Sequence, residues 1–313
     1  MQYGKIISTG FGQAWKHKTL WIFGLFISGG MSFNVFDITK RSDTGNWRGL
    51  NIPQVSDFLA NNLFIIAFLA VAIILAIILF IVLNTISTGG LIDAAGQLKR
   101  NETYSFGKAV RAGLTFFWRV LGLGILTFVV VLAFILFLLL VGVVAFVIHT
   151  AIGVLSLLIL IPIFIAGIFI AVITSAMANR HIVIRNDRVF DAITDGFNLW
   201  KSHLGPSVAY TFIYIAIGIA VFLGILLIAI SAVLPFVGVA FVNLIVALIV
   251  GIPVVLAILL VVEGFSGSAM HLMTTEFYFQ LVDEGRPAPA PVFEMPGDIP
   301  PAPPASDPSP DIG

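Results

Sequence analysis

The chain has 313 residues, 59% of them hydrophobic and 10% charged, with a mean hydropathy of +1.09 and a formal net charge of zero. This composition excludes an ordinary soluble globular protein and predicts a chain that is mostly embedded in a membrane. The absence of cysteine also excludes disulfides, iron–sulfur clusters and zinc sites built on thiolates.

The first predicted element is an amphipathic helix over residues 3–15, because its apolar residues recur at steps of three and four. The same spacing returns at residues 106–118, and again at 189–200, where the tryptophan comes one residue earlier. Each copy leads into a long apolar stretch. The copies consist of Tyr3, Ile6, Ile7, Gly10, Phe11, Ala14 and Trp15; of Phe106, Ala109, Val110, Gly113, Leu114, Phe117 and Trp118; and of Val189, Ala192, Ile193, Gly196, Phe197 and Trp200.

Uncharged stretches between these copies are long enough for six membrane spans. Sixty uncharged residues separate Arg119 from Arg180, and 61 separate Lys201 from Glu263. One span needs about 20 apolar residues, so each stretch holds two spans. Two shorter uncharged runs nearer the N-terminus, of 18 and 35 residues, hold one span each. All should be helices, because an open chain in lipid must satisfy its backbone groups internally. The predicted spans are 20–36, 62–86, 120–147, 152–178, 206–232 and 236–262.

We expect turns between the later spans and proline kinks within two of them. We expect a tight turn near His149 between the third and fourth spans. The fifth and sixth spans should turn near Pro235, where the missing N–H and fixed φ suit the start of a helix. Pro162 and Pro253 lie inside predicted spans, and we expect them to kink those helices.

Basic residues are divided unequally between the two sides that six spans create. The side with both termini and the connections after the second and fourth spans carries thirteen Lys and Arg residues, and the other side carries three. The positive-inside rule makes the first side cytoplasmic. The sequence therefore predicts a multi-pass protein of the plasma or inner membrane with both termini in the cytoplasm.

Two domains are expected. Residues 1–284 form the six-helix transmembrane domain, with 37–61 as its one sizeable external segment. Residues 285–313 hold ten of the fifteen prolines and should be a disordered cytoplasmic tail. The predicted fold class is all-α: a polytopic membrane protein with six transmembrane helices in three hairpin units, each preceded by a cytoplasmic amphipathic helix. Each unit ends in a run of small and polar residues after or at the end of its second span. These runs are Ser87-Thr88-Gly89-Gly90, Thr174-Ser175-Ala176 and Ser266-Gly267-Ser268-Ala269.

The three amphipathic helices have two interpretations that the sequence leaves open. Tryptophan and basic residues suit a helix lying at the membrane interface. Alternatively, the apolar stripes pack on the cytoplasmic ends of the spans. A glycine within each stripe costs about 1 kcal/mol relative to alanine, and its recurrence favours close helix packing. The interface or helix-packing candidates are Trp15, Trp118, Trp200, Lys16, Lys108, Arg111, Arg119, Lys201, Gly10, Gly113 and Gly196.

Two short motifs carry a family resemblance. The amphipathic helices end in Trp15-Lys16 and Trp118-Arg119, and an Arg-Asn-acidic step precedes the second and third copies, at 100–102 and 185–187. With six spans, residues 1–280 resemble the membrane-domain family of bacterial glycerophosphodiester phosphodiesterases and related uncharacterised six-helix prokaryotic membrane proteins. In those phosphodiesterases catalysis belongs to a separate soluble barrel domain rich in His and Glu. The 313 residues hold no such domain, so the resemblance implies a fold and not an activity.

No set of residues predicts catalysis, metal binding or a cofactor. The five histidines fit no metal-ligand spacing. We expect Glu263, His271 and Glu276 on a solvated continuation of the last helix. We therefore expect a protein that is not an enzyme and carries no cofactor.

The predicted function is a non-enzymatic integral membrane protein with a lipid- or protein-interaction role at the cytoplasmic face of the bilayer. Its expected partners are membrane lipids, above all anionic lipids of the inner leaflet, and then another membrane protein; nucleic acid is not expected. The alternative is a transporter or channel component for a neutral or lipidic substrate. Internal repeats occur in transporters, although ionisable residues are scarce inside these spans.

Overall fold

The computed structural model describes residues 1–32, 62–100 and 102–284, and every regular element in these ranges is helical. Five helices are long and apolar enough to cross a membrane: α4, α5, α6 with the π-helical segment η4, α8 and α9. The elements are α1 (Tyr3–Lys16), α2 (Leu20–Ser32), α4 (Leu63–Lys99), α5 (Phe106–Ile148), α6 (Thr150–Arg180), η4 (His181–Arg185), α7 (Val189–Ser202), α8 (Leu204–Val242) and α9 (Leu244–Glu284).

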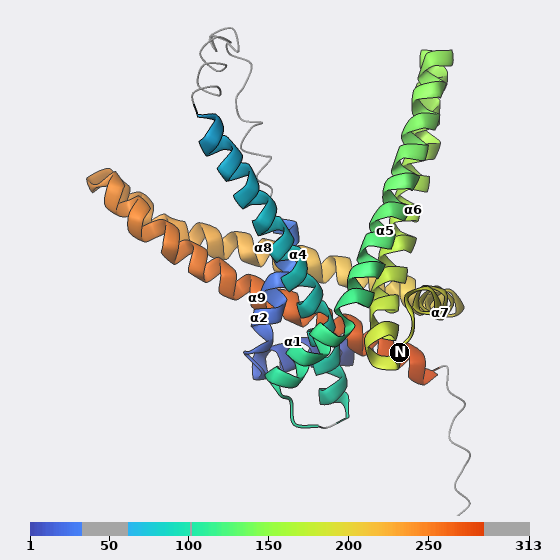
Figure 1. Ribbon diagram of the computed structural model, residues 1–313, viewed down its shortest axis with the longest axis horizontal. Helices are drawn as coiled ribbons and strands as arrows, with labels where there is room; N and C mark the ends of the chain where they lie inside the picture. The colour runs from blue at the N-terminus through green and yellow to red at the C-terminus, as the bar shows by residue number, and fades with distance from the viewer. Residues whose placement is uncertain (33–61, 101, 285–313) are drawn as a thin grey trace, which may run out of the picture.

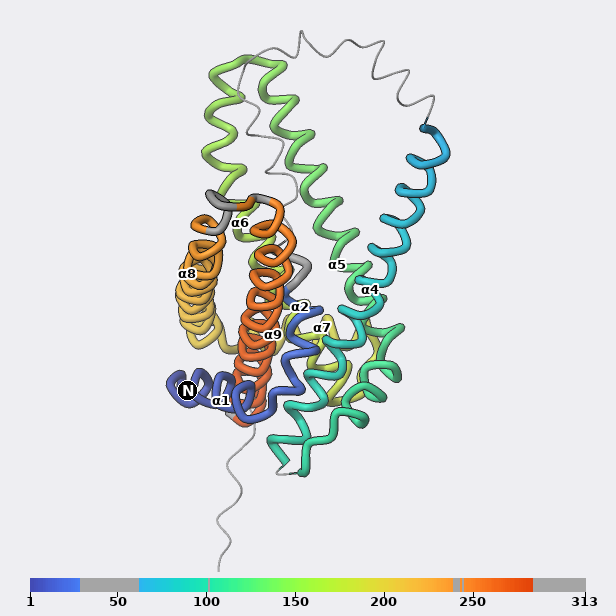
Figure 2. Tube along the Cα trace, turned by 90° about the vertical axis from the view of Figure 1, so that its left-hand side faces the viewer, coloured from blue at the N-terminus to red at the C-terminus, as the bar shows by residue number. Residues whose placement is uncertain are grey.

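The long helices form three arms that diverge from a common base (Figures 1 and 2). One arm is α4, the second pairs α5 with α6, and the third pairs α8 with α9. We call the packed end of the molecule the base: α1, α2, η4, α7, the first turns of α5 and α8, and the last turns of α4, α6 and α9. In the most apolar part of each long helix at most 11% of the residues are buried within the protein. The arms therefore present their apolar side chains outward, as a membrane requires.

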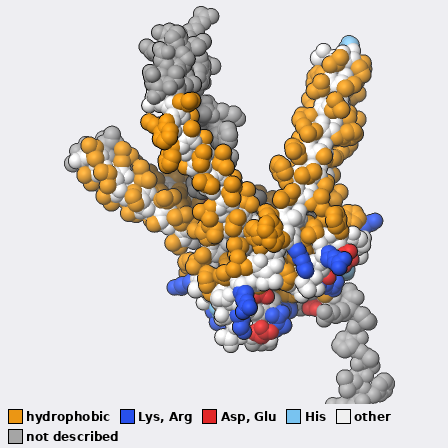
Figure 3. All heavy atoms as spheres, viewed as in Figure 1, with side chains coloured by type: hydrophobic (Ala, Val, Ile, Leu, Met, Phe, Trp, Pro, Cys, Tyr) orange, Lys and Arg blue, Asp and Glu red, His pale blue; other side chains and the backbone are white. Residues whose placement is uncertain are grey.

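Charge and hydrophobicity are separated along the same direction. In Figure 3 the arms are covered by apolar side chains, and the Lys, Arg, Asp and Glu side chains gather on the base. Three clusters of buried hydrophobic residues also lie there, and they contain Leu91, Met273 and Ile182 respectively. The base is thus the packed core of the molecule.

Small residues let α2 approach α9 closely. A Cβ added to Gly264 would lie 2.6 Å from the carbonyl oxygen of Trp21. The Ser28 hydroxyl donates to the carbonyl of Glu263 at 3.1 Å, and the Asn84 amide of α4 donates to the carbonyl of Phe26 at 2.8 Å. These contacts hold α2 between α4 and α9, by the small-residue packing that lets membrane helices touch backbone to backbone.

The predicted first span is only partly described. The helix α2 covers the stretch from Leu20 to Ser32. The remainder of the span, the external segment 37–61 and the tail 285–313 lie outside the described residues.

The turn between the fifth and sixth spans differs from the prediction. Pro235 lies inside α8, and the chain turns at Asn243, eight residues later. The carboxamide oxygen of Asn243 accepts a hydrogen bond from the amide of Val246 at 3.2 Å, as a helix N-cap does. Proline is tolerated within a membrane helix because its surroundings satisfy the freed carbonyl. The helices α6 and α9 likewise continue through Pro162 and Pro253.

The amphipathic segments also differ among themselves. The first and third are separate helices, α1 and α7, and each is followed by a histidine as its C-cap residue, His17 and His203. The second is continuous with the third predicted span in α5, a single helix of 43 residues. The residues that follow Trp118 are Arg119 and Val120, and neither of them breaks a helix, so the backbone hydrogen bonds continue.

Candidate functional site

The glycines of the three amphipathic segments lie at helix crossings. A Cβ added to Gly10 would be 2.9 Å from the carbonyl oxygen of Ala269 on α9. One added to Gly196 would be 3.2 Å from that of Thr174 on α6 and 2.9 Å from the amide nitrogen of Ala178. Gly113 approaches the carbonyl of Ile86 on α4 most closely. Each segment therefore rests on the last part of a long helix with no room for a side chain.

These crossings involve three different long helices. The start of α5 packs on α4, α7 packs on α6, and α1 packs on α9, so each of the three long helices receives one amphipathic segment. The contacted carbonyls belong to Ile86, Thr174 and Ala269, which therefore occupy equivalent positions on α4, α6 and α9. Counting seven residues on from each carbonyl reaches Asp93, His181 and Glu276. The base thus carries a titratable side chain at the same step of all three helices.

Each of these three side chains has a polar partner. The carboxylate of Asp93 accepts a hydrogen bond from the Gln97 amide at 2.6 Å. Burial raises the pKa of Asp93, and the Gln97 hydrogen bond opposes that shift. The imidazole Nδ1 of His181 lies 3.1 Å from a carboxylate oxygen of Asp187. The third, Glu276, lies 3.4 Å from Lys99 Nζ, which joins α9 to α4.

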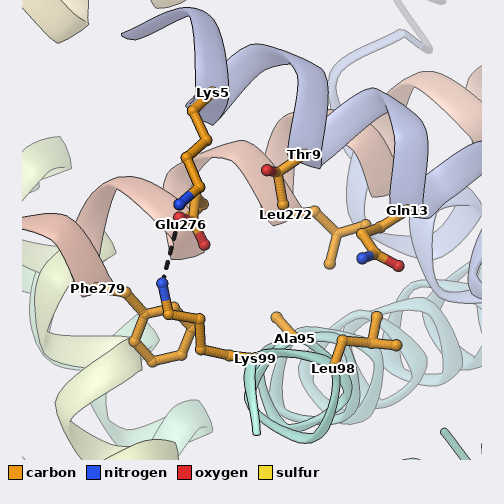
Figure 4. Close-up of a pocket in the computed structure, with 9 residues that line it drawn as sticks. All are labelled: Lys5, Thr9, Gln13, Ala95, Leu98, Lys99, Leu272, Glu276 and Phe279. Carbon is orange, nitrogen blue, oxygen red and sulfur yellow. Dashed lines mark hydrogen bonds and ion pairs between the residues drawn. The ribbon is translucent and has the colours of Figure 1, made fainter. Parts of the chain in front are cut away.

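A cavity of about 200 Å³ surrounds the third pair, between α1, α4 and α9 (Figure 4). Glu276 is only 6% exposed, and Lys99 Nζ also lies 5.5 Å from the ring centre of Phe279. Lys5 and Gln13 enter from α1. Apolar side chains of α4 and α9 complete the walls. The arrangement sets two lysines, one carboxylate and one side-chain amide around a partly enclosed space at the base.

The end of α9 differs from the sequence prediction. We expected His271 and Glu276 on a solvated helix, but Glu276 is buried and His271 is half-buried, with its Nδ1 enclosed and unpaired among the residues described. The buried neighbours Thr275, Phe277 and Tyr278 show that this helix stays inside the base. The apolar and aromatic residues around Glu276 are the signal in the sequence that could have indicated burial.

Near the end of α6, Arg180 is only 2% exposed. Its guanidinium donates to the carbonyl oxygens of Ala176 and His271, the latter at 3.3 Å. Its Nε has no partner within the described ranges. Sequence reasoning placed Arg180 only as a boundary of a span, because a buried arginine that binds backbone carbonyls has no motif.

A third group of polar residues joins η4 to α7 and is a candidate metal site. Ligand atoms of His181, Asp187 and Asp195 lie within 4.8 Å of one another. An imidazole and two carboxylates are donor types that hold divalent cations. In the structure the imidazole is already hydrogen-bonded to Asp187, and Asp195 is exposed. These contacts account for the group as a link between two helices.

The three tryptophans of the amphipathic segments have different surroundings. Trp15 is 66% exposed and Trp118 is 78% exposed. Trp200 is buried, and its Nε1 donates to the Thr174 hydroxyl at 3.0 Å. Trp15 also forms an aromatic cluster with Trp21 and Phe265. The interface role is thus open to the first two, and Trp200 packs within the base.

The basic candidates divide in a similar way. Lys16, Lys108 and Arg111 are exposed, and none of them has an ion pair with a described residue. Arg119 is half-buried and donates to the backbone and side-chain oxygens of Asn186 at 3.0 and 2.6 Å. Lys201 Nζ lies 5.6 Å from the ring centre of Phe197. The sequence pattern did not separate these two kinds of basic residue.

The imidazole of His271, whose Nδ1 is enclosed, makes stability depend on pH. Burial, and then the positive charge of Arg180, lower the pKa of His271 from 6.5 to about 3. Since the unfolded chain takes up a proton below pH 6.5 and the folded chain does not, stability is present above pH 6.5 and is lost as the pH falls toward 3. We expect a loss of about 1–2 kcal/mol between pH 6.5 and 5 in thermal unfolding of the purified protein.

The variant His271→Gln should lose this part of the pH dependence. The same substitution at His149, which is exposed at the far end of α5, is the control and should keep it. An unchanged slope in His271→Gln would contradict the assignment to this histidine.

Comparisons of the chain with protein-family models, with curated proteins and with solved structures give no match. The resemblance to the phosphodiesterase membrane domains therefore stays a prediction from short motifs. The fold and the geometry of the base are the observations on which a function can be built.

Proposed function

We propose that this protein is a non-enzymatic integral membrane protein whose base lies at the cytoplasmic face of the bilayer and binds anionic lipids. In this proposal the chain crosses the membrane six times, α2 is part of the first span, and both termini are cytoplasmic. The three amphipathic segments form the lipid-facing rim of the base. A membrane-protein partner would meet the same surface.

The observation that carries this proposal is the exposure of Trp15 and Trp118 on two amphipathic segments that also carry the exposed cations Lys16, Lys108 and Arg111. Each tryptophan ends an amphipathic segment, and Lys16 directly follows the first of them. An exposed indole next to Lys or Arg suits the boundary between acyl chains and anionic headgroups. The arms above the base are apolar on all sides, which supports a bilayer at that level.

Transport is less well supported. A transporter needs a polar path between its spans, and ionisable side chains inside spans usually mark one. The most apolar windows of the five long helices contain few buried residues, so these windows enclose little space among themselves. The cavity between α1, α4 and α9 is lined by residues that lie beyond the predicted span ends.

The test replaces both exposed tryptophans. Trp15→Ala together with Trp118→Ala should reduce the amount of anionic phospholipid that co-purifies with the protein, measured by native mass spectrometry. Burial of a large apolar side chain contributes about 1.5–3 kcal/mol, so the loss of each indole from the interface should have an effect of that order. The fold should persist, because neither side chain is buried in the base.

The matched control is Phe68→Ala, which removes an aromatic side chain that is 69% exposed on the arm formed by α4. It should leave the retained phospholipid unchanged. Equal retention in the double variant and the control, with unfolding temperatures equal to wild type, would sink the proposal.

A further inference from the structure

The cavity between α1, α4 and α9 has more hydrogen-bond donors than acceptors. Lys5 and Lys99 carry three N–H donors each, and in Figure 4 both ammonium groups point toward Glu276. Lys99 lies 3.4 Å from a carboxylate oxygen of Glu276, which engages one donor and one charge. The three ionisable side chains together leave one positive charge at the cavity.

Neutral groups add to this excess. The Thr9 hydroxyl lies between Lys5 and Gln13 along α1, and the amide nitrogen of Gln13 faces the cavity (Figure 4). The carboxamide oxygen of Gln13 is enclosed and has no partner among the described residues. The amide therefore offers the cavity a donor while its own acceptor points away.

The apolar walls of the cavity strengthen the hydrogen bonds that these donors can form. Ala95, Leu98 and Leu272 line the cavity with apolar atoms. Charged hydrogen bonds strengthen where the local dielectric constant is low. At about 30 Å³ for one water, a space of about 200 Å³ has room for roughly six waters or for one small tetrahedral oxyanion with its substituent.

We propose that this cavity binds a phosphate group. Lys5 supplies the free positive charge, Thr9 and Gln13 supply neutral donors, and the buried carboxylate of Glu276 holds Lys99 at the edge of the site. The phosphate belongs either to a lipid headgroup or to a small water-soluble phosphate ester. The proposal does not require the lipid contact of Trp15 and Trp118, which lies at other residues.

The test measures binding of defined probes to the full chain. The soluble probes are inorganic phosphate and glycerol 3-phosphate, added to protein in phosphatidylcholine nanodiscs and followed by the unfolding temperature and by calorimetry. The lipid probe is phosphatidic acid, introduced into the same nanodiscs. Binding of a soluble probe assigns a free phosphate ligand, and binding of phosphatidic acid alone assigns a headgroup; either result supports the proposal.

The principal variant is Lys5→Gln, because Lys5 is exposed and its loss leaves the pair of Lys99 and Glu276 intact. This variant should bind about tenfold more weakly to the probe that the wild-type protein binds. A tenfold loss of affinity is expected when one charge-assisted hydrogen bond is removed. Thr9→Val should weaken this binding by a smaller factor. Lys18→Gln removes another exposed lysine of the base that does not line the cavity, and it should bind as wild type does.

Two results would overturn the proposal: no binding of any probe to the folded wild-type protein, or equal binding by wild type and Lys5→Gln. The double variant at Trp15 and Trp118 separates this proposal from the previous one. If that variant loses co-purified lipid but keeps a soluble probe, the two sites are distinct.

Discussion

Gly113→Ala should lower the free energy of unfolding by about 3 kcal/mol, the upper end of the cost of inserting a methyl group into a packed interface. The added Cβ would collide with the backbone carbonyl of Ile86 and would also lie 3.0 Å from the side-chain Cγ2 of the same residue. Backbone atoms cannot rotate away as a side chain can, so α5 would have to move off α4. Thermal unfolding of the purified protein, followed by circular dichroism, measures the loss.

The matched control lies six residues earlier on the same helix. Gly107 has no atom within 4 Å of an added Cβ. Gly107→Ala should leave stability unchanged or raise it by up to about 1 kcal/mol, since alanine is the better helix former. The pair Gly10→Ala and Gly12→Ala repeats the comparison on α1, where Gly12 is likewise open. Equal stability of Gly113→Ala and Gly107→Ala would refute the close crossing.

Local spacing in the sequence was sufficient to predict the helical class and the long apolar helices. Lipid leaves the backbone few alternatives, so hydropathy alone identifies such helices. The prediction of a turn near Pro235 was wrong, and the reason is again the lipid environment. Proline breaks a helix in water, whereas α8 continues through it and turns at Asn243. The continuity of α5 was missed because no local signal distinguishes an amphipathic helix from the first turns of a span.

The polar interior of the base was beyond local reasoning. Glu276 and Lys99 are 177 residues apart, and their contact depends on how α9 crosses α4. Arg180 is buried because α6 and α9 meet there, which periodicity within either helix cannot indicate. The sequence could suggest that the repeated glycines lie at contacts, but it could not say which helix each would meet.

The exposed basic residues of the base should strongly affect the affinity for anionic phospholipid. Replacing Lys16, Lys108 and Arg111 together by glutamine should weaken binding of anionic phospholipid about 100-fold at low salt, because each basic residue near an anionic surface contributes about 1 kcal/mol. These three are exposed and lack ion pairs with described residues, so their charge is available to headgroups. Titration of the purified protein with phosphatidylglycerol, against phosphatidylcholine, measures the change.

The control is the matched triple Lys40→Gln, Arg41→Gln and Arg48→Gln, which removes the same charge from the side predicted to be external. It should leave the affinity for phosphatidylglycerol unchanged if headgroups bind at the base. The effect of the first triple should also shrink as salt rises, since exposed charges are screened over about 10 Å at 0.1 M. Equal losses in both triples would show that net charge, and not the surface of the base, sets the affinity. A loss confined to the first triple would place the lipid contact on the amphipathic segments, where Trp15 and Trp118 supply its apolar part.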